Sequence, residues 1–154
     1  MKSFPGVSRK TIAVAALFII AILSVTALVV GCGGGNSPDG AVTKYFDAWQ
    51  SGDWNAFKAS VVPQKLTKDQ EALAKQKFEQ VKIKVQGLSL TTELNKADKN
   101  KATVVITDGK ITYTAPILGQ QKTETRDFKS LQKEERVVNV VKVNDVWYVD
   151  NTLG

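Results

Sequence analysis

The chain is 154 residues long and carries 21 Lys and Arg residues against 15 Asp and Glu residues, with no histidine and a single cysteine. One cysteine excludes a disulfide framework within the chain, and the lack of histidine removes both the usual general base near neutral pH and the commonest zinc ligand. Three bases (Lys2, Arg9 and Lys10) and no acid stand in the first 31 residues, so removing these three from 21 leaves 18 bases against 15 acids, or +3, in the rest. Such a weak excess does not make the basic stripe of a nucleic-acid-binding protein, and we expect no nucleic acid partner.

The first 31 residues have the pattern of an export signal. The cationic start is followed by an apolar run over residues 11–30 (TIAVAALFIIAILSVTALVV), and then by Gly31 and Cys32. A positive flank, an apolar stretch and a small residue are typical of a secretory signal peptide. The run is also long enough to cross a bilayer as an uncleaved helix, which leaves a retained signal anchor as the alternative.

The residues Val29-Val30-Gly31-Cys32 resemble the lipobox of bacterial lipoproteins, in which an aliphatic and a small residue precede the cysteine. The resemblance implies that residues 1–31 are a signal peptide removed before Cys32, and that Cys32 carries a lipid on its sulfur. Two or more acyl chains make membrane attachment stable, at about 0.8 kcal/mol per buried methylene. We therefore expect the membrane as a partner and the extracytoplasmic face, at the cell surface or in the periplasm, as the location. Residues 32–40 then form the lipidated cysteine and a short glycine-rich tether.

Three helices are predicted at the start of the domain that follows, which we place at residues 41–154. Ser37 before a proline is typical of an N-cap, and Gly52 of a C-terminal stop. Asp53 is placed to cap a second, short helix, and Thr67 and Gln70 have capping-box spacing ahead of a third. Apolar residues at helical spacing form the buried line of each helix: Val42, Tyr45, Phe46 and Trp49; Trp54, Phe57 and Val61; Ala74, Phe78 and Val81.

After the third helix, apolar residues alternate with period two, which predicts β-strands. The apolar face switches at Gln86-Gly87 and again at Asp108-Gly109, on either side of a polar turn at residues 95–100. If Leu94 pairs with Lys101, both switches fall at one level, and a single long hairpin bends sharply there. The alternative is a separate tight hairpin with Asp108-Gly109 as its turn.

The last third of the chain is predicted to hold a polar connection and a closing hairpin. Residues 116–131 (PILGQQKTETRDFKSL) form the connection, with an edge strand as a possible element inside it. Residues 135–143 and 146–150 form the hairpin, joined by a two-residue turn at Asn144-Asp145. Both faces of this hairpin are substantially apolar, so we expect it in the centre of the sheet and not at its edge.

Helices followed by a bent antiparallel sheet indicate an α+β fold, with the N-terminal helices packed in the sheet. The segments VTKYFDAWQSGDWNAF (42–57) and VNDVWYVD (143–150) resemble the opening and the end of cystatin-like, nuclear transport factor 2-like domains. The resemblance implies a cone over about residues 41–151, whose sheet curls around the first helix and leaves a pocket at its open end. Some members of that superfamily are enzymes acting on hydrophobic small molecules, whereas many others bind, dimerise or scaffold, so the fold does not decide the function.

Aromatic residues are the candidates for lining such a pocket. The set is Tyr45, Trp49, Tyr113 and Trp147, although aromatic residues at helical or strand spacing more often pack in the core. The acids fit structural positions, since Asp53 is placed as a helix cap and Asp108 and Asp145 stand in predicted turns. We therefore predict no catalytic residue, no cofactor and no metal, although enzymatic activity stays open.

These observations favour a non-catalytic, membrane-anchored module of the cell envelope that binds an envelope protein or a small ligand. The alternatives are a cone that binds or transforms a hydrophobic ligand, and a structural role in envelope assembly. The interior of the cone discriminates between them. A cavity with converging polar groups favours a ligand, whereas an interior filled by Trp49, Phe78 and Trp147 favours a role for the outer surface.

Overall fold

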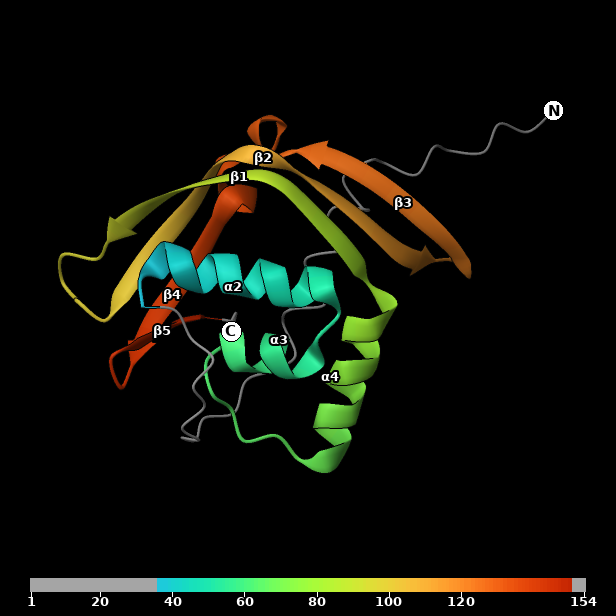
Figure 1. Cartoon of the computed structure of the whole chain (residues 1–154), viewed down its shortest axis with the longest axis horizontal. Coiled ribbons are helices and arrows are strands. Elements are labelled where there is room, and N and C mark those ends of the chain that lie inside the picture. Colours follow the sequence, from blue (N-terminus) through green and yellow to red (C-terminus); the bar gives the residue numbers. More distant parts are fainter. Residues whose placement is uncertain (1–35, 151–154) are drawn as a thin grey trace, which may run out of the picture.

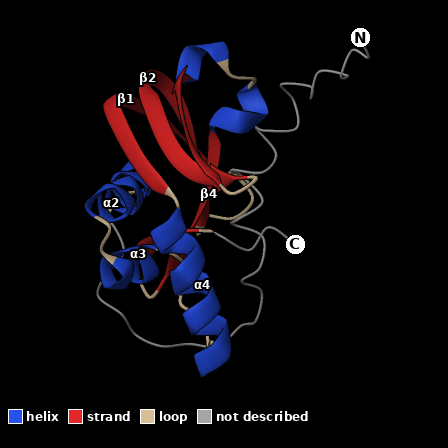
Figure 2. Cartoon of the chain, turned by 90° about the vertical axis from the view of Figure 1, so that its right-hand side faces the viewer, coloured by secondary structure: helices blue, strands red, loops and turns tan. Residues whose placement is uncertain are grey.

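The structure, a computed structural model, describes residues 36–150. In this part of the chain three α-helices precede a five-stranded antiparallel sheet that curls strongly, which confirms the predicted α+β class. The sheet arches over the first helix, α2, and the helices α3 and α4 lie on the side of α2 away from the arch (Figure 1). A view along α2 shows this layering end-on (Figure 2).

The first described helix, α2 (Pro38–Ser51), begins and ends where the sequence predicts. The Ser37 Oγ accepts a hydrogen bond from the Gly40 N–H at 3.2 Å, and Gly52 takes a left-handed conformation with φ of 69°. A residue without a side chain adopts this conformation at little cost, which is why the helix stops there. The helix includes residues 38–40, which were expected to belong to the tether.

Two further helices are capped by the residues that the sequence indicates. Asp53 accepts from the Ala56 N–H at 3.0 Å at the start of α3 (Trp54–Ser60). Thr67 and Gln70 form the reciprocal bonds of a capping box at the start of α4 (Lys68–Gln80). Only Phe78 of α4 is buried, so Ala74 contributes less to the interior than its spacing predicts.

The long hairpin with a sharp bend is confirmed. Strands β1 (Lys82–Leu94) and β2 (Lys101–Ile117) pair over their length, and the register slips between the pairs Gln86–Lys110 and Leu90–Ile106. Both predicted switches of the apolar face therefore fall at the same level of the ribbon, where β1 and β2 arch over α2 in Figure 1.

Two details of that prediction are wrong. Leu94 pairs with Ala102 and not with Lys101, because the polar turn is one residue longer than the predicted pairing allows. The tight hairpin at Asp108-Gly109 does not form either, since β2 runs through both residues. The strands approach closely at the bend: a Cβ atom on Gly109, whose φ is 121°, would lie 2.9 Å from the carbonyl oxygen of Gln86.

The polar connection at residues 116–131 does contain an edge strand, which the sequence analysis gave only as a possible element. Strand β3 (Gln120–Asp127) pairs with the second half of β2, so β2 runs on to Ile117 and turns through Leu118-Gly119. A 3₁₀ turn at Phe128–Ser130 and another at Lys133–Arg136 lead to the last hairpin. The strand predicted from residue 135 therefore begins only at Val137.

The last hairpin, β4 (Val137–Val143) and β5 (Val146–Val149), has the predicted register, with Trp147 opposite Lys142 and Val149 opposite Val140. Its predicted central position is right for β4 and wrong for β5. The strand order β1-β2-β4-β5 places β5 at an end of the sheet. That end is covered at its edge by the chain after α3, where the Val62 N–H donates to the Val149 carbonyl at 3.1 Å. Trp147 and Tyr148 point to opposite faces of β5 and are both buried, which explains why both faces of an end strand are apolar.

Candidate functional site

Three of the four predicted pocket residues lie inside the hydrophobic core. Tyr45 is 4% exposed, Trp49 8% and Trp147 5%, and all three belong to one cluster of buried side chains. Phe78 joins the same cluster, so the three residues expected to fill the cone if it has no ligand role (Trp49, Phe78 and Trp147) are packed together there. The interior beneath the sheet is occupied by aromatic side chains in this region.

Aromatic contacts join the three helices beneath the sheet. The rings of Trp49 on α2 and Phe78 on α4 are stacked with centroids 6.3 Å apart, and Phe57 on α3 lies 4.7 Å from Phe78. The indole N–H of Trp49 donates to the Val81 carbonyl at 3.2 Å, where α4 passes into β1. A buried ring with a satisfied N–H is a stable core element, and removing such a tryptophan typically costs about 3–5 kcal/mol.

Tyr45 carries a polar group that this packing leaves unsatisfied. Its ring lies between 5.2 and 5.6 Å from the rings of Phe57, Phe46 and Trp49, centroid to centroid. Its hydroxyl is buried without a hydrogen-bond partner, and burial raises the pKa of Tyr45 well above the usual value of tyrosine. A hydroxyl held neutral in this way is no general base at physiological pH.

The fourth predicted residue, Tyr113, lies apart from this cluster in a polar group of its own. Tyr113 on β2 is the cross-strand partner of Glu124 on β3, and its hydroxyl donates to the Glu124 carboxylate at 2.5 Å. The Arg126 Nε also donates to that carboxylate, at 2.6 Å, and the Arg126 guanidinium lies 5.8 Å from the centre of the Tyr113 ring. We call Tyr113, Glu124 and Arg126 the β2–β3 polar cluster.

The β2–β3 polar cluster lies on the inner face of the sheet. Tyr113 pairs with Ile83, which packs against the core, and cross-strand partners share a face. Burial, and next the hydrogen bond to Glu124, raise the pKa of Tyr113 to about 12. The same carboxylate raises the pKa of Arg126 by its hydrogen bond. The Glu124 carboxylate therefore accepts from a phenol and from a guanidinium, and these two hydrogen bonds hold the three side chains together on one face of the sheet.

The acids considered in the sequence have structural roles or lie in solvent. Asp53 caps α3, and Asp145 stands in the β4–β5 turn. Asp108 accepts from the Gly109 N–H at the bend, and the Lys129 ammonium lies 2.7 Å from its carboxylate. The hydrogen bond that the Lys129 ammonium donates, and next the one from the Gly109 N–H, lower the pKa of Asp108. Asp47 is exposed on α2.

No group of three His, Cys, Asp or Glu side chains within residues 36–150 is placed to hold a metal ion. Among the same residues no helix is both long and apolar enough to cross a membrane. The predicted signal peptide at 1–31 and the predicted lipidation site at Cys32 lie outside the described residues.

The turn between β2 and β3 exposes apolar groups that the sequence analysis missed. Leu118 is 95% exposed and has a positive φ of 52°, and Pro116, two residues before it, is also exposed. The signal was present in the sequence as Ile117-Leu118-Gly119. With few apolar residues after Leu118, the sequence of residues 116–131 predicts a polar connection and not a tight turn at this point.

Comparison with known proteins adds no relative to this description. No protein-family model matches the chain, and neither the curated proteins nor the solved structures contain a significant match.

Proposed function

We propose that this chain is an extracytoplasmic lipoprotein, held at a membrane by lipid on Cys32, whose domain binds another component of the cell envelope without catalysing a reaction. The observation that carries the first part is Val29-Val30-Gly31-Cys32 at the end of an apolar run. The only thiol of the chain stands where lipobox chemistry would modify it.

The start of α2 fits this anchor. Only Gly33 to Asn36 separate Cys32 from Ser37, the N-cap of α2. A chain of that length spans at most about 18 Å when fully extended. A lipid on Cys32 would therefore keep the folded domain close to the bilayer, within reach of partners that are themselves at the membrane.

The domain itself we assign to the cystatin-like, nuclear transport factor 2-like cones. Support comes from the order of the elements, with helices first, and from the bent hairpin of β1 and β2 that curls over α2. It also comes from the Gly-Asp step between α2 and α3, where Gly52 ends one helix and Asp53 caps the next.

The packing of the interior supports a role for the outer surface. Trp49, Phe78 and Trp147 are buried in one core cluster on the inner side of the sheet, where enzymes of this superfamily would hold a substrate. The acids that could have served as a base are used as caps, in turns or in ion pairs. We therefore favour a binding or interaction module over an enzyme.

A ligand-binding cone is the second candidate, because of the β2–β3 polar cluster. Tyr113, Glu124 and Arg126 bring an aromatic face and polar groups together on the inner side of the sheet. Binding of a small ligand there would change the environment of the Tyr113 ring. A Tyr113→Phe variant with unchanged ligand affinity would contradict this candidate.

The lipid anchor is tested by replacing the thiol. In a bacterium grown with labelled palmitate, we expect label on the chain and recovery of the chain with membranes. Cys32→Ser should lose the label, whereas the matched control Gly33→Ser keeps the cysteine and should retain it. Label on the Cys32→Ser variant would contradict the proposal, and an unlabelled, uncut chain in the membrane fraction would establish the retained signal anchor instead.

A further inference from the structure

The tip of the β2–β3 hairpin, residues 116–119, is the most exposed apolar feature among the described residues. Leu118 is 95% exposed, against 64% for Leu94 and 46% for Leu73, the other exposed large apolar residues described. Its side chain therefore contributes almost nothing to the core. The folded domain does not need a leucine at this position for packing.

The backbone at the tip disfavours leucine as well. Leu118 and Gly119 have φ of 52° and 78°, the left-handed pair that a tight two-residue hairpin turn requires. The β4–β5 hairpin meets the same requirement at Asn144 and Asp145, with φ of 50° and 62°. Asn and Asp tolerate this conformation, whereas a leucine is strained in it. A strained and fully exposed apolar residue points to a contact outside the domain.

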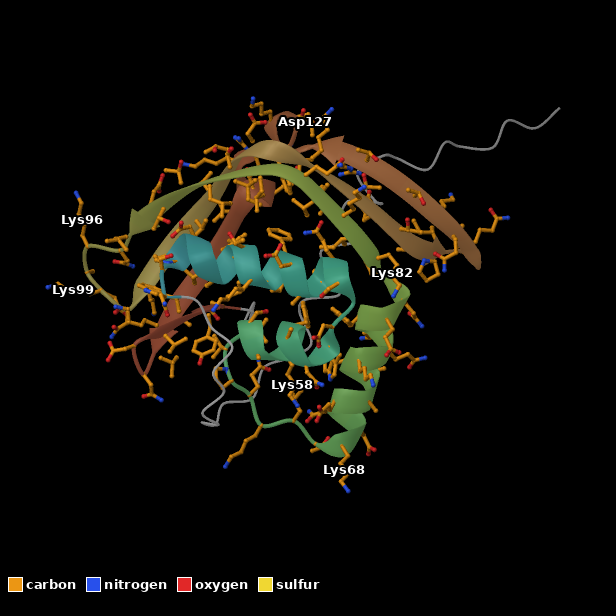
Figure 3. The ribbon with its side chains drawn as sticks, viewed as in Figure 1. Lys58, Lys68, Lys82, Lys96, Lys99 and Asp127 are labelled. Atoms are coloured by element: carbon orange, nitrogen blue, oxygen red, sulfur yellow. The ribbon has the colours of Figure 1, made fainter. Side chains whose placement is uncertain are left out.

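Lysines lie on both faces of the strands that lead to this tip. Lys82 and Lys84 on β1 pair with Thr114 and Thr112 of β2 on the outer face of the sheet, whereas Lys122 on β3 pairs with Ala115, which packs against the core on the inner face. All three lysines are exposed, and none is in an ion pair with a described residue. Figure 3 shows Lys82 where α4 passes into β1, on the half of the sheet that carries the β2–β3 hairpin.

The acid of β3 that lies nearest to the tip in sequence does not balance these charges. Glu124 is held by the Tyr113 hydroxyl and by Arg126 in the β2–β3 polar cluster. The tip thus has one exposed apolar side chain, with exposed lysines that are not ion-paired to any described residue on the strands that lead to it. A bilayer that contains anionic lipid has the complementary chemistry, with acyl chains beneath a negatively charged layer of headgroups.

We propose that the β2–β3 tip is a second membrane contact, in which Leu118 enters the boundary of the acyl chains while Lys82, Lys84 and Lys122 bind anionic headgroups. One leucine gives only a weak contact, which becomes effective when a tether already holds the domain at the bilayer. The inference therefore rests on the membrane attachment proposed above.

The position of the tip determines what this contact does. In Figure 1 the N-terminal end of α2, where the tether would join, and the β2–β3 turn lie at opposite ends of the long axis. Attachment at both ends lays that axis along the bilayer. The long axis of the domain then has a fixed direction relative to the membrane, and the surface away from the bilayer is presented to partners.

Hydrogen exchange on the full chain in vesicles tests the contact. The protein is reconstituted into phosphatidylcholine vesicles with and without phosphatidylglycerol, and is also measured in detergent. In the anionic vesicles we expect the amides of residues 117–121 to exchange roughly tenfold more slowly than in detergent. The β4–β5 turn is the internal reference, because it has the same backbone geometry without an apolar residue, and its exchange should stay unchanged.

Two matched variants test whether the Leu118 side chain itself makes the contact. Leu118→Asn keeps the turn, since Asn tolerates the left-handed conformation, and it should abolish the slowing. Leu73→Asn removes another exposed leucine, on α4. The charged residues near Leu73 already have partners, since Glu71 is paired with Lys58 and Lys75 with Glu79. The Leu73→Asn variant should therefore keep the slow exchange at the tip.

Several outcomes would overturn the inference. Equal exchange at the tip in all three preparations would exclude the contact, and slowing that survives in Leu118→Asn would exclude the leucine from it. Slowing in detergent that increases with protein concentration would assign the tip to a second copy of the chain. Flotation of the same samples separates the two proposals: a chain that floats with an unprotected tip contradicts only the tip, whereas a chain that does not float contradicts the attachment as well.

Discussion

The hydroxyl of Tyr45 is a polar group buried among aromatic rings. It has lost its contact with water and has no hydrogen-bond partner in the structure, and an unsatisfied buried group of this kind costs about 1–3 kcal/mol. Tyr45→Phe removes the hydroxyl and keeps the ring contacts with Phe46, Trp49 and Phe57. We expect the variant to gain about 1 kcal/mol of unfolding free energy, measured by urea denaturation. A loss of stability would show that the hydroxyl is bonded.

Tyr113 makes the stability of the domain sensitive to alkaline pH. Its pKa is raised from 10.0 to about 12, first by burial and then by the hydrogen bond to Glu124. Between these two values the unfolded chain loses the phenolic proton while the folded chain keeps it. Stability is therefore complete below pH 10 and falls as the pH rises toward 12.

The matched variant for this effect is Tyr113→Phe, which has no phenolic proton to lose. The unfolding free energy of the wild type, followed from neutral pH to pH 12, should fall more steeply above pH 10 than that of the variant. The comparison uses the slopes and not the absolute values, because the variant also loses the hydrogen bond to Glu124. Parallel curves for the two proteins would contradict the assignment.

At the scale of residues, the sequence predicts the members of the core better than those of the β2–β3 polar cluster. Helical spacing places Tyr45 and Trp49 on one face of α2, and aromatic residues at this spacing more often pack in the core than line a pocket. The partners of Tyr113 could not be predicted, because Glu124 and Arg126 lie in a stretch with too few apolar residues to indicate a strand. Their positions depend on pairing with β2, which is a tertiary contact.

Among the elements, the bend of the β1–β2 ribbon depends on Gly109. A Cβ atom there would lie 2.9 Å from the Gln86 oxygen and 3.0 Å from the Gly87 oxygen, both backbone atoms that cannot move without opening the strands. The φ of 121° adds strain for any other residue. We expect Gly109→Ala to lower the unfolding free energy by about 3 kcal/mol, measured by chemical denaturation.

Gly87 is the control, because it lies at the same bend with a φ of 64° and has open space where a Cβ would be. Gly87→Ala should therefore cost only the backbone strain, about 1 kcal/mol. Equal losses in the two variants would show that strain alone, and not the approach of the strands, accounts for the glycine at position 109.

The elements that the sequence predicts correctly are those with local signals. Caps and apolar spacing define α2, α3 and α4, and changes of the apolar face locate the bend of β1 and β2. The errors concern pairing at a distance. A hairpin with two apolar faces could lie in the centre of the sheet or at a covered end. Only the pairing of β4 with β2 places β5 at the end, which the contact of Val61 with Val149 covers.

For the molecule as a whole, one hydrophobic core joins α2, α3, α4 and the strands β1, β2, β4 and β5, either through buried residues or through side chains packed against them, and Phe128 directly after β3 belongs to it as well. Domains with a single core of this size usually unfold in one cooperative step. Their stability comes from apolar burial. A lipid on Cys32 would then determine where the domain works without being needed for its fold, so folding and attachment should be separable.

A shortened chain beginning at Asn36 tests that separation. We expect it to unfold in a single thermal transition, with the same midpoint by far-ultraviolet circular dichroism and by tryptophan fluorescence, since Trp49 and Trp147 report on the same core as the sheet. Addition of a metal chelator should leave the midpoint unchanged, because the core is apolar and no described group of acids is placed to bind a metal. Two separate midpoints would show that the helices and the sheet do not form one folding unit. A transition lost in chelator would show that a metal, and not apolar packing, holds the domain together.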